Sequence, residues 1–98
     1  MTGQRSVMGV TWTEAKSEDG DALVMSTTWK DFAQAMTFVN AVAFLAERAN
    51  HHPDIAIHWN RVDLRLWSHD AGGITDRDRA LAAEIEKLVA SAAESGGS

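Results

Sequence analysis

Four histidines lie close together in the middle of the sequence, and they are the residues best suited to chemistry. They are His51, His52, His58 and His69, which all fall within nineteen residues. Histidine has an unperturbed pKa of about 6.5, so near neutral pH it can either donate or accept a proton. A group of histidines can therefore place a proton donor beside a proton acceptor. The residue types and their spacing predict general acid–base chemistry around His51-His52 and His69.

Two other interpretations of the histidines stay open. Each one could be an ordinary surface or helix-capping residue. Three histidines can also bind zinc and leave one coordination position free. Adjacent histidines such as His51 and His52 rarely point at one ion unless the backbone bends sharply, and the sequence has no cysteine that could form a thiolate site. The sequence therefore favours proton transfer, and no metal ligand is predicted.

A long helix is predicted directly before the histidine pair. Asp31 can cap its start, and it runs to about Asn50. Pro53 ends the helical region, because the residue before a proline avoids helical angles. Apolar residues cover most of the circumference of this helix, which is more than one sheet face needs. Another helix or another subunit can cover the second apolar side.

The rest of the chain alternates strand patterns with turns and closes with a second helix. Asp19-Gly20 is a strong hairpin signal between the first two strands. Thr75 with Asp78 resembles a capping box at the start of the last helix. The predicted strands span residues 10–16, 23–29, 55–60 and 62–68, and the predicted helices span residues 31–50 and 76–92. The order ββαββα predicts an α+β domain with a four-stranded, mostly antiparallel sheet and helices packed on one face.

The predicted elements place His51, His52 and His69 in loops and His58 in the strand at 55–60. His51 and His52 follow the long helix, while His69 follows the last strand. Loops held by a rigid scaffold often carry functional sites. If the strands pair, these two loops lie at one end of the sheet.

Length and composition limit the class of protein. The chain has 98 residues and 45% apolar residues, which predicts one domain over residues 1–98 with flexible ends at 1–8 and 94–98. Its net charge is −5 and its nine Lys and Arg are scattered, so a nucleic-acid partner is not expected. The absence of cysteine excludes disulfides. No apolar run suits a secretory signal or a membrane span, so we expect a cytoplasmic protein without a membrane partner.

Several motifs together resemble the pterin-4a-carbinolamine dehydratase (4a-hydroxytetrahydrobiopterin dehydratase) family. The segment from Glu47 to Pro53 resembles the family's E-x-x-x-H-H-P motif. Three later segments resemble N-K/R-V, L-x-T/S-H and G-L/I-S/T-x-x-D, and they are Asn60-Arg61-Val62, Leu66-Trp67-Ser68-His69 and Gly73-Ile74-Thr75-Asp76-Arg77-Asp78. Trp12 and the segment Trp29-Lys30-Asp31-Phe32 also match. The resemblance covers residues 12 to 90, and the combination of these motifs is far more specific than any one of them.

Two features depart from the family pattern. The family usually begins with a helix before its first strand, and the eleven residues before Trp12 cannot hold a full version of it. The loss of that helix bears on packing or assembly more than on chemistry. Trp67 and Ser68 stand where the family commonly has S/T-T. Ser68 keeps a hydroxyl group, whereas Trp67 adds bulk that could narrow or close the rim of a pocket.

The resemblance implies dehydration of a 4a-hydroxytetrahydropterin to the quinonoid dihydropterin, which recycles the cofactor of aromatic amino acid hydroxylases. By the same resemblance, His51 and His69 donate a proton to the leaving hydroxyl, and His52 acts as the base or binds the pterin. No metal and no organic cofactor are needed. The substrate-binding residues that the resemblance implies are Glu47, His51, His52, Pro53, Ser68, His69, Asp70, Ala71 and Asp78.

The expected partners are the pterin substrate, an aromatic amino acid hydroxylase pathway, and further copies of the chain in a homodimer or homotetramer. The wide apolar surface of the long helix in so short a chain motivates the oligomer. The alternative is a non-catalytic protein-binding or assembly module of the same fold. The presence of all three histidines, His51, His52 and His69, favours the enzyme.

Overall fold

The computed structural model describes residues 11–18 and 20–96, and within them the predicted element order is confirmed. A short 3₁₀ turn also lies between the last strand and the last helix. The elements are β1 (Thr13–Ala15), β2 (Ala22–Thr28), α1 (Phe32–Ala49), β3 (Asp54–His58), β4 (Arg61–Leu66), the 3₁₀ turn (His69–Ala71) and α2 (Asp76–Gly96).

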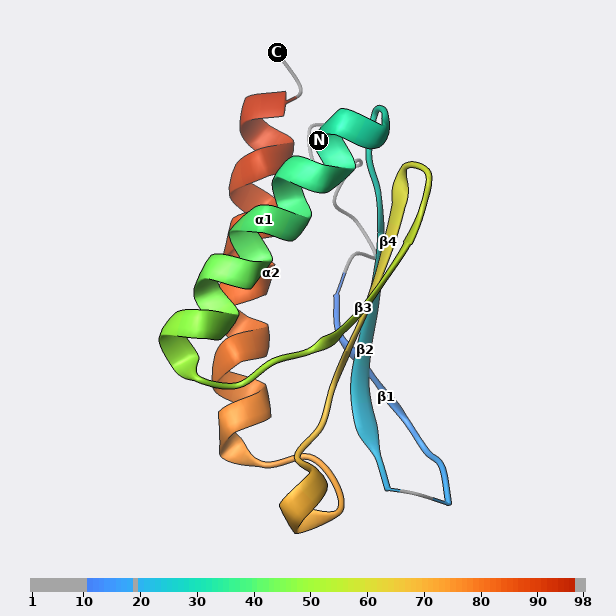
Figure 1. Ribbon diagram of the computed structural model, residues 1–98, viewed down its shortest axis with the longest axis vertical. Helices are drawn as coiled ribbons and strands as arrows, with labels where there is room; N and C mark the ends of the chain where they lie inside the picture. Colours follow the sequence, from blue (N-terminus) through green and yellow to red (C-terminus); the bar gives the residue numbers. More distant parts are fainter. Residues whose placement is uncertain (1–10, 19, 97–98) are drawn as a thin grey trace, which may run out of the picture.

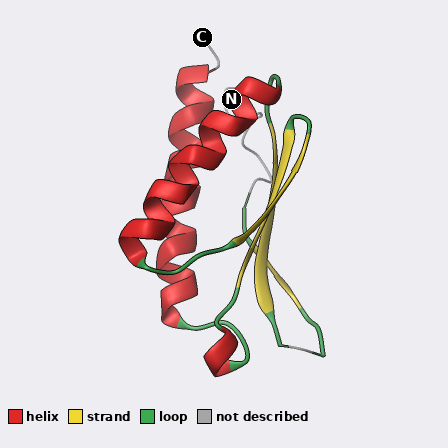
Figure 2. Cartoon of the chain, in the orientation of Figure 1, coloured by secondary structure: helices red, strands yellow, loops and turns green. Residues whose placement is uncertain are grey.

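The four strands form one antiparallel sheet in the order β1-β2-β4-β3. Both helices lie on the same side of this sheet, and no helix of residues 11–18 and 20–96 covers the other face (Figures 1 and 2). The predicted α+β architecture, with helices on one face of an antiparallel sheet, is therefore confirmed. Neither helix of the described chain has an apolar stretch long enough to cross a lipid bilayer.

Buried and more exposed side chains alternate along the two central strands, β2 and β4, as expected for a sheet with one buried face. Leu23 and Met25 of β2 are buried, and in β4 the same holds for Val62, Leu64 and Leu66. Met25 pairs with Leu64 in the antiparallel register, so the apolar side chains of both strands meet on the helix side. The helices complete the core with Ala35, Phe38, Val42 and Ala46 of α1 and Leu81, Ala82, Ile85 and Val89 of α2.

Helix α1 begins and ends as predicted. The carboxylate of Asp31 accepts a hydrogen bond of 2.9 Å from the backbone N–H of Gln34, which caps the first turn. Asn50 ends the helix in the left-handed conformation, with φ of 53°. The predicted surplus of apolar surface is present, because Phe32 and Phe44 are 50% and 64% exposed.

Several element ends differ from the predicted ones. β1 covers only Thr13–Ala15, and the start of the predicted strand, residue 10, lies outside the described residues, as does the predicted flexible segment 1–8. β3 stops at His58 because Trp59 turns the chain with a positive φ of 57°. α2 continues to Gly96 rather than ending near residue 92, since Ala93 and Glu94 favour helix.

Candidate active site

Three element ends meet at one end of the molecule. Figure 1 shows the C-terminal end of α1, the end of β4 and the start of α2 close to one another there. The segment after α1 carries His51 and His52, and the 3₁₀ turn after β4 carries His69. The predicted placement of these two loops at one end of the sheet is confirmed.

A surface pocket of about 360 Å³ lies between these elements, and all three histidines of interest line it. Its lining consists of Asn50, His51, His52, Trp67, Ser68, His69, Asp70 and Arg77. Two proton-transfer groups must both reach one substrate in order to act on it together. The shared pocket meets this requirement.

His51 is nearly buried, and both of its ring nitrogens have partners. Nε2 lies 2.5 Å from Oδ1 of Asp78, and Nδ1 lies 3.3 Å from Nη2 of Arg77. A guanidinium group can only donate hydrogen bonds, so Nδ1 accepts and the ring proton sits on Nε2, facing Asp78. Only 8% of His51 is exposed. The side chain is therefore held in one orientation at the inner wall of the pocket.

Asp78 joins three segments of the chain from a fully buried position. Its Oδ2 accepts hydrogen bonds of 2.8 Å from both the hydroxyl of Ser68 and the backbone N–H of Thr75. The second of these is the contact that the predicted capping box requires. Burial alone would raise the pKa of Asp78, but hydrogen bonds from His51, the Thr75 backbone and Ser68 outweigh it and lower that pKa. Asp78 therefore stays ionised beneath His51.

His52 differs from His51 because it is exposed. Its Nε2 lies 2.6 Å from Oε2 of Glu47, and the two side chains are 56% and 77% exposed. Solvent screens such a pair, so its energy is small. Glu47 orients the ring of His52 from the last turn of α1 and is absent from the lining of the pocket.

The loop that carries His69 is closed by backbone hydrogen bonds. Ser68 and Gly73 bond to each other in both directions, at 2.9 and 3.2 Å, which holds residues 69–72 in a tight turn. Gly20 packs against this loop from the β1–β2 turn, and a Cβ at Gly20 would collide with the carbonyl oxygen of Gly72. Gly20 also has a φ of +128°, which only glycine adopts without strain. The turn presents His69 at the surface.

Other residues considered from the sequence lie outside the pocket. Pro53 and Ala71 flank the pocket in sequence but do not line it. His58 lies on β3, where its Nε2 is 3.3 Å from Asp63, and it is also absent from the pocket.

Three pocket residues were not among the predicted site residues, namely Asn50, Trp67 and Arg77. Arg77 did carry a sequence signal, because it stands between two aspartates in the first turn of α2. A positive charge there opposes the helix dipole. A residue that is unfavourable at the start of its helix but lines a pocket points to a role at that pocket.

Within residues 11–18 and 20–96, no group of three or more His, Asp or Glu side chains is placed so that it could hold a metal ion.

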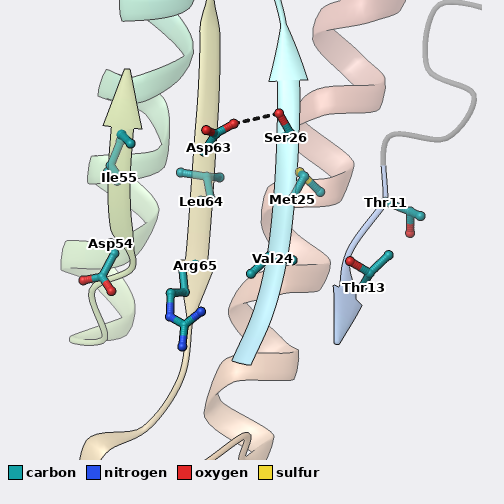
Figure 3. Close-up of a pocket in the computed structure, with 11 residues that line it drawn as sticks. Thr11, Thr13, Val24, Met25, Ser26, Asp54, Ile55, Asp63, Leu64 and Arg65 are labelled. Carbon is teal, nitrogen blue, oxygen red and sulfur yellow. Dashed lines mark hydrogen bonds between the residues drawn. The ribbon is translucent and has the colours of Figure 1, made fainter. Parts of the chain in front are cut away.

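A larger pocket, of about 530 Å³, lies on the open face of the sheet (Figure 3). It contains none of the histidines. Its Asp63 accepts a hydrogen bond of 2.7 Å from Ser26, and this bond, with the nearby charges of Arg61 and His58, outweighs burial and lowers the pKa of Asp63. The figure shows this pair across β4 and β2, with Asp54 and Arg65 further along the strands. The carboxylate of Asp63 is already engaged by these neighbours, and the larger pocket has no histidine. We therefore place the proton-transfer chemistry in the smaller pocket.

Known proteins resemble this chain over most of its length. The family model described as Pterin 4 alpha carbinolamine dehydratase matches residues 4–88. A protein of Thermomicrobium roseum, provisionally named a pterin-4-alpha-carbinolamine dehydratase, is 59% identical over 69 residues, which cover 70% of this chain and 74% of that protein. A protein of Chloroflexus aggregans with the same provisional name is 49% identical over 72 residues, or 74% of this chain and 77% of that protein.

Two solved structures resemble the fold. A Brucella melitensis protein described as a transcriptional coactivator/pterin dehydratase superposes with a TM-score of 0.71 and 31% identity, covering 79% of this chain and 80% of that one. A pterin dehydratase-like protein described as a RuBisCO assembly factor in the alpha-carboxysome superposes with a TM-score of 0.67 and 25% identity, covering 80% of this chain and 88% of that one. The family match and the identities to its members lead to one conclusion: this chain belongs to the pterin 4 alpha carbinolamine dehydratase family.

Proposed function

We propose that this protein dehydrates a 4a-hydroxytetrahydropterin to the quinonoid dihydropterin and water, by general acid–base catalysis with His51, His52 and His69. The observation that carries the proposal is that these three side chains line one pocket. Its volume of about 360 Å³ falls in the range, roughly 300–1,000 Å³, of small-molecule sites. The family membership supports a pterin as the substrate, and we extend the proposal to pterin cofactor recycling in the cytoplasm.

The reaction needs one proton donor and one proton acceptor. The C4a–O bond breaks with its electron pair on oxygen, and the oxygen takes up a proton and leaves as water. The lone pair of N5 forms the new C4a=N5 double bond, and N5 gives up its proton. One proton is consumed and one is released, so histidines alone can carry the reaction. General acid–base catalysis of this type contributes roughly 10²–10⁴-fold to the rate.

The surroundings of each histidine support a division of roles. His69 and His51 are the proposed donors to the leaving hydroxyl, and His52 is the proposed base or pterin-binding group. His69 is exposed and can reach the substrate directly. His51 can donate through Nδ1 only after the guanidinium of Arg77 has moved away and Nδ1 has taken up a proton, because in this structure Nδ1 accepts a hydrogen bond from that guanidinium. Asp78 holds Nε2 of His51 throughout, which fixes the nitrogen that faces the pocket.

The other proposed binding residues surround these three side chains. Ser68 and Asp70 line the pocket, while Glu47 orients His52 from behind. Asp78 supports His51 and Ser68 from the protein interior. Pro53 and Ala71 would act through the shape of the two loops.

The direct test measures how fast a 4a-hydroxytetrahydropterin loses water with and without the purified protein. We expect a faster decay that is unchanged after prolonged treatment with a chelator, because histidines supply both proton transfers. An activity that the chelator removes and added zinc restores would instead establish a metal-dependent mechanism. A folded protein that leaves the decay at the uncatalysed rate would contradict the proposed activity.

A binding module is the second candidate function. The supporting observation is the superposition on the protein described as a RuBisCO assembly factor. In that case the pocket histidines would be dispensable, and a folded protein would show no dehydration. The same assay therefore separates the two candidates.

We further propose that the chain forms a homo-oligomer, most simply a two-fold dimer. β3 is an edge strand, and all five of its residues, Asp54–His58, are exposed. Ile55 and Ile57 are each 37% exposed on this edge. An open edge strand offers unpaired backbone groups to another strand. Pairing with a second copy would cover both the edge and the isoleucines, and α1, with its exposed Phe44, offers the surface for a larger assembly.

Light scattering at micromolar concentration should give at least twice the mass of the single chain. Replacing both Ile55 and Ile57 with lysine should return the protein to a monomer, because charged side chains on an edge strand oppose strand pairing. Thr28→Lys, at an exposed position of the central strand β2, is the control and should leave the mass unchanged. A wild-type protein with the mass of one chain would rule out the dimer.

A further inference from the structure

The three histidines of the pocket are held in place by different kinds of contact. His51 is held by Asp78 and Arg77, and His52 is held by Glu47. Within the described part of the chain, the imidazole of His69 makes no hydrogen bond, and its ring packs on Trp67 instead. The two ring centroids are 4.0 Å apart, with an angle of 42° between the ring planes. Trp67 therefore occupies the place that a carboxylate takes beside each of the other two histidines.

Trp67 directly follows β4, which ends at Leu66. Leu64 and Leu66 point into the core, so by strand alternation Arg65 points to the open face. The guanidinium of Arg65 lies 5.6 Å from the centroid of the indole ring, within the range of a cation–π contact. The indole is half-buried and also lines the pocket. It thus forms a fixed aromatic wall between Arg65 and His69.

The indole nitrogen shows which part of Trp67 matters. Its Nε1 is buried without a hydrogen-bond partner in residues 11–18 and 20–96. The indole N–H therefore makes no hydrogen bond within the site, and Trp67 meets His69 through its ring face.

We propose that Trp67 is a positioning residue that holds the imidazole of His69 in the orientation needed for proton transfer. The proposal rests on the proposed dehydratase function. His69 sits at the surface on a short turn, so without the stacked ring its side chain is free to change rotamer. A displacement of a catalytic group by about 1 Å can lower the rate about 10²-fold.

The test compares two substitutions of similar bulk. Trp67→Leu keeps an apolar side chain but removes the ring face, and we expect kcat to fall by about 10- to 100-fold, with KM changed by less than about threefold. Trp67→Phe keeps a ring face and removes the unpaired N–H, so it should restore most of kcat. Trp59→Leu is the control, because Trp59 is 65% exposed on the β3–β4 turn and lies outside the pocket. Equal kcat values for Trp67→Leu and the wild type, or a change confined to KM, would overturn the positioning role.

A measurement without substrate separates this inference from the dehydratase activity. In proton NMR spectra, the imidazole protons of His69, assigned with a His69→Gln variant, should be shifted upfield by the ring current of Trp67. The shift should disappear in Trp67→Leu and persist in part in Trp67→Phe. An unshifted His69 in the folded wild type would overturn the inference even if Trp67→Leu failed to fold. A shifted His69 in a protein without dehydratase activity would instead refute the proposed function and leave the stacking contact established.

Discussion

Replacing His52 with alanine should lower kcat/KM for a 4a-hydroxytetrahydropterin by roughly 10²–10⁴, if His52 is the base or the ring anchor. The fold should survive, because the side chain of His52 is 56% exposed and its contact is an exposed glutamate, Glu47. The free energy of unfolding should change by less than about 1 kcal/mol, as for most substitutions away from the core. Steady-state kinetics and a thermal melt on the same preparation measure both effects.

His58→Ala is the matched control for this variant. His58 is 53% exposed and has a carboxylate neighbour, Asp63, at 3.3 Å, so it resembles His52 in its surroundings. It lies on β3, outside the pocket, and its loss should leave the rate within a few-fold. A folded His52→Ala protein with full activity would remove His52 from the mechanism and weaken the case for the whole site.

Asp78→Asn should damage both stability and catalysis. The substitution removes a buried charge that accepts hydrogen bonds from His51, Ser68 and Thr75, and it brings an amide donor towards groups that also donate. We expect unfolding to become easier by about 2–4 kcal/mol, as when one member of a buried network is lost. Since the orientation of His51 depends on the same carboxylate, kcat/KM should fall by roughly 10²-fold. Chemical denaturation and kinetics measure the two losses separately.

Asp76→Asn is the control for Asp78→Asn, because Asp76 is an exposed aspartate in the same first turn of α2. Its loss should cost no more than about 1 kcal/mol, which is the range of a helix-dipole contact. If both variants behaved alike, Asp78 would be only a helix-start charge, and its position under His51 would have no catalytic consequence.

The pH dependence of stability gives a second test of Asp78. Its pKa in the folded protein is lowered from the ordinary value of 3.8, so the ionised form stabilises the fold at any pH above that value. The stabilisation is lost as the pH falls below 3.8 towards the folded pKa. The difference in unfolding free energy between the wild type and Asp78→Asn should therefore be constant from neutral pH down to about 4 and shrink below it. A difference that stayed constant below pH 4 would mean that folding does not lower the pKa of Asp78.

The local part of the structure could be predicted from the sequence. Asp31 as the cap of α1, the end of that helix at Asn50 and the alternation of β2 and β4 all depend on residues within a few positions of one another. Such short-range preferences act before any tertiary contact exists. The same logic placed His51, His52 and His69 at the ends of elements, and the resemblance of the surrounding motifs to a known family linked them to one reaction.

The contacts between distant segments were decided only by the tertiary structure. The capping pattern identified Asp78 as a helix-start residue and the family resemblance placed it among the site residues, but only packing showed that it lies under His51, 27 positions earlier in the chain. Packing also placed Arg77 against Nδ1 of His51 and Trp67 against His69, and it left His58 outside the pocket. Burial, ring orientation and the partner of each imidazole nitrogen arise where α1, β4 and α2 meet. The sequence by itself thus determined which residues could transfer protons, whereas the packing of these three elements decided which of them share a pocket and what holds each one there.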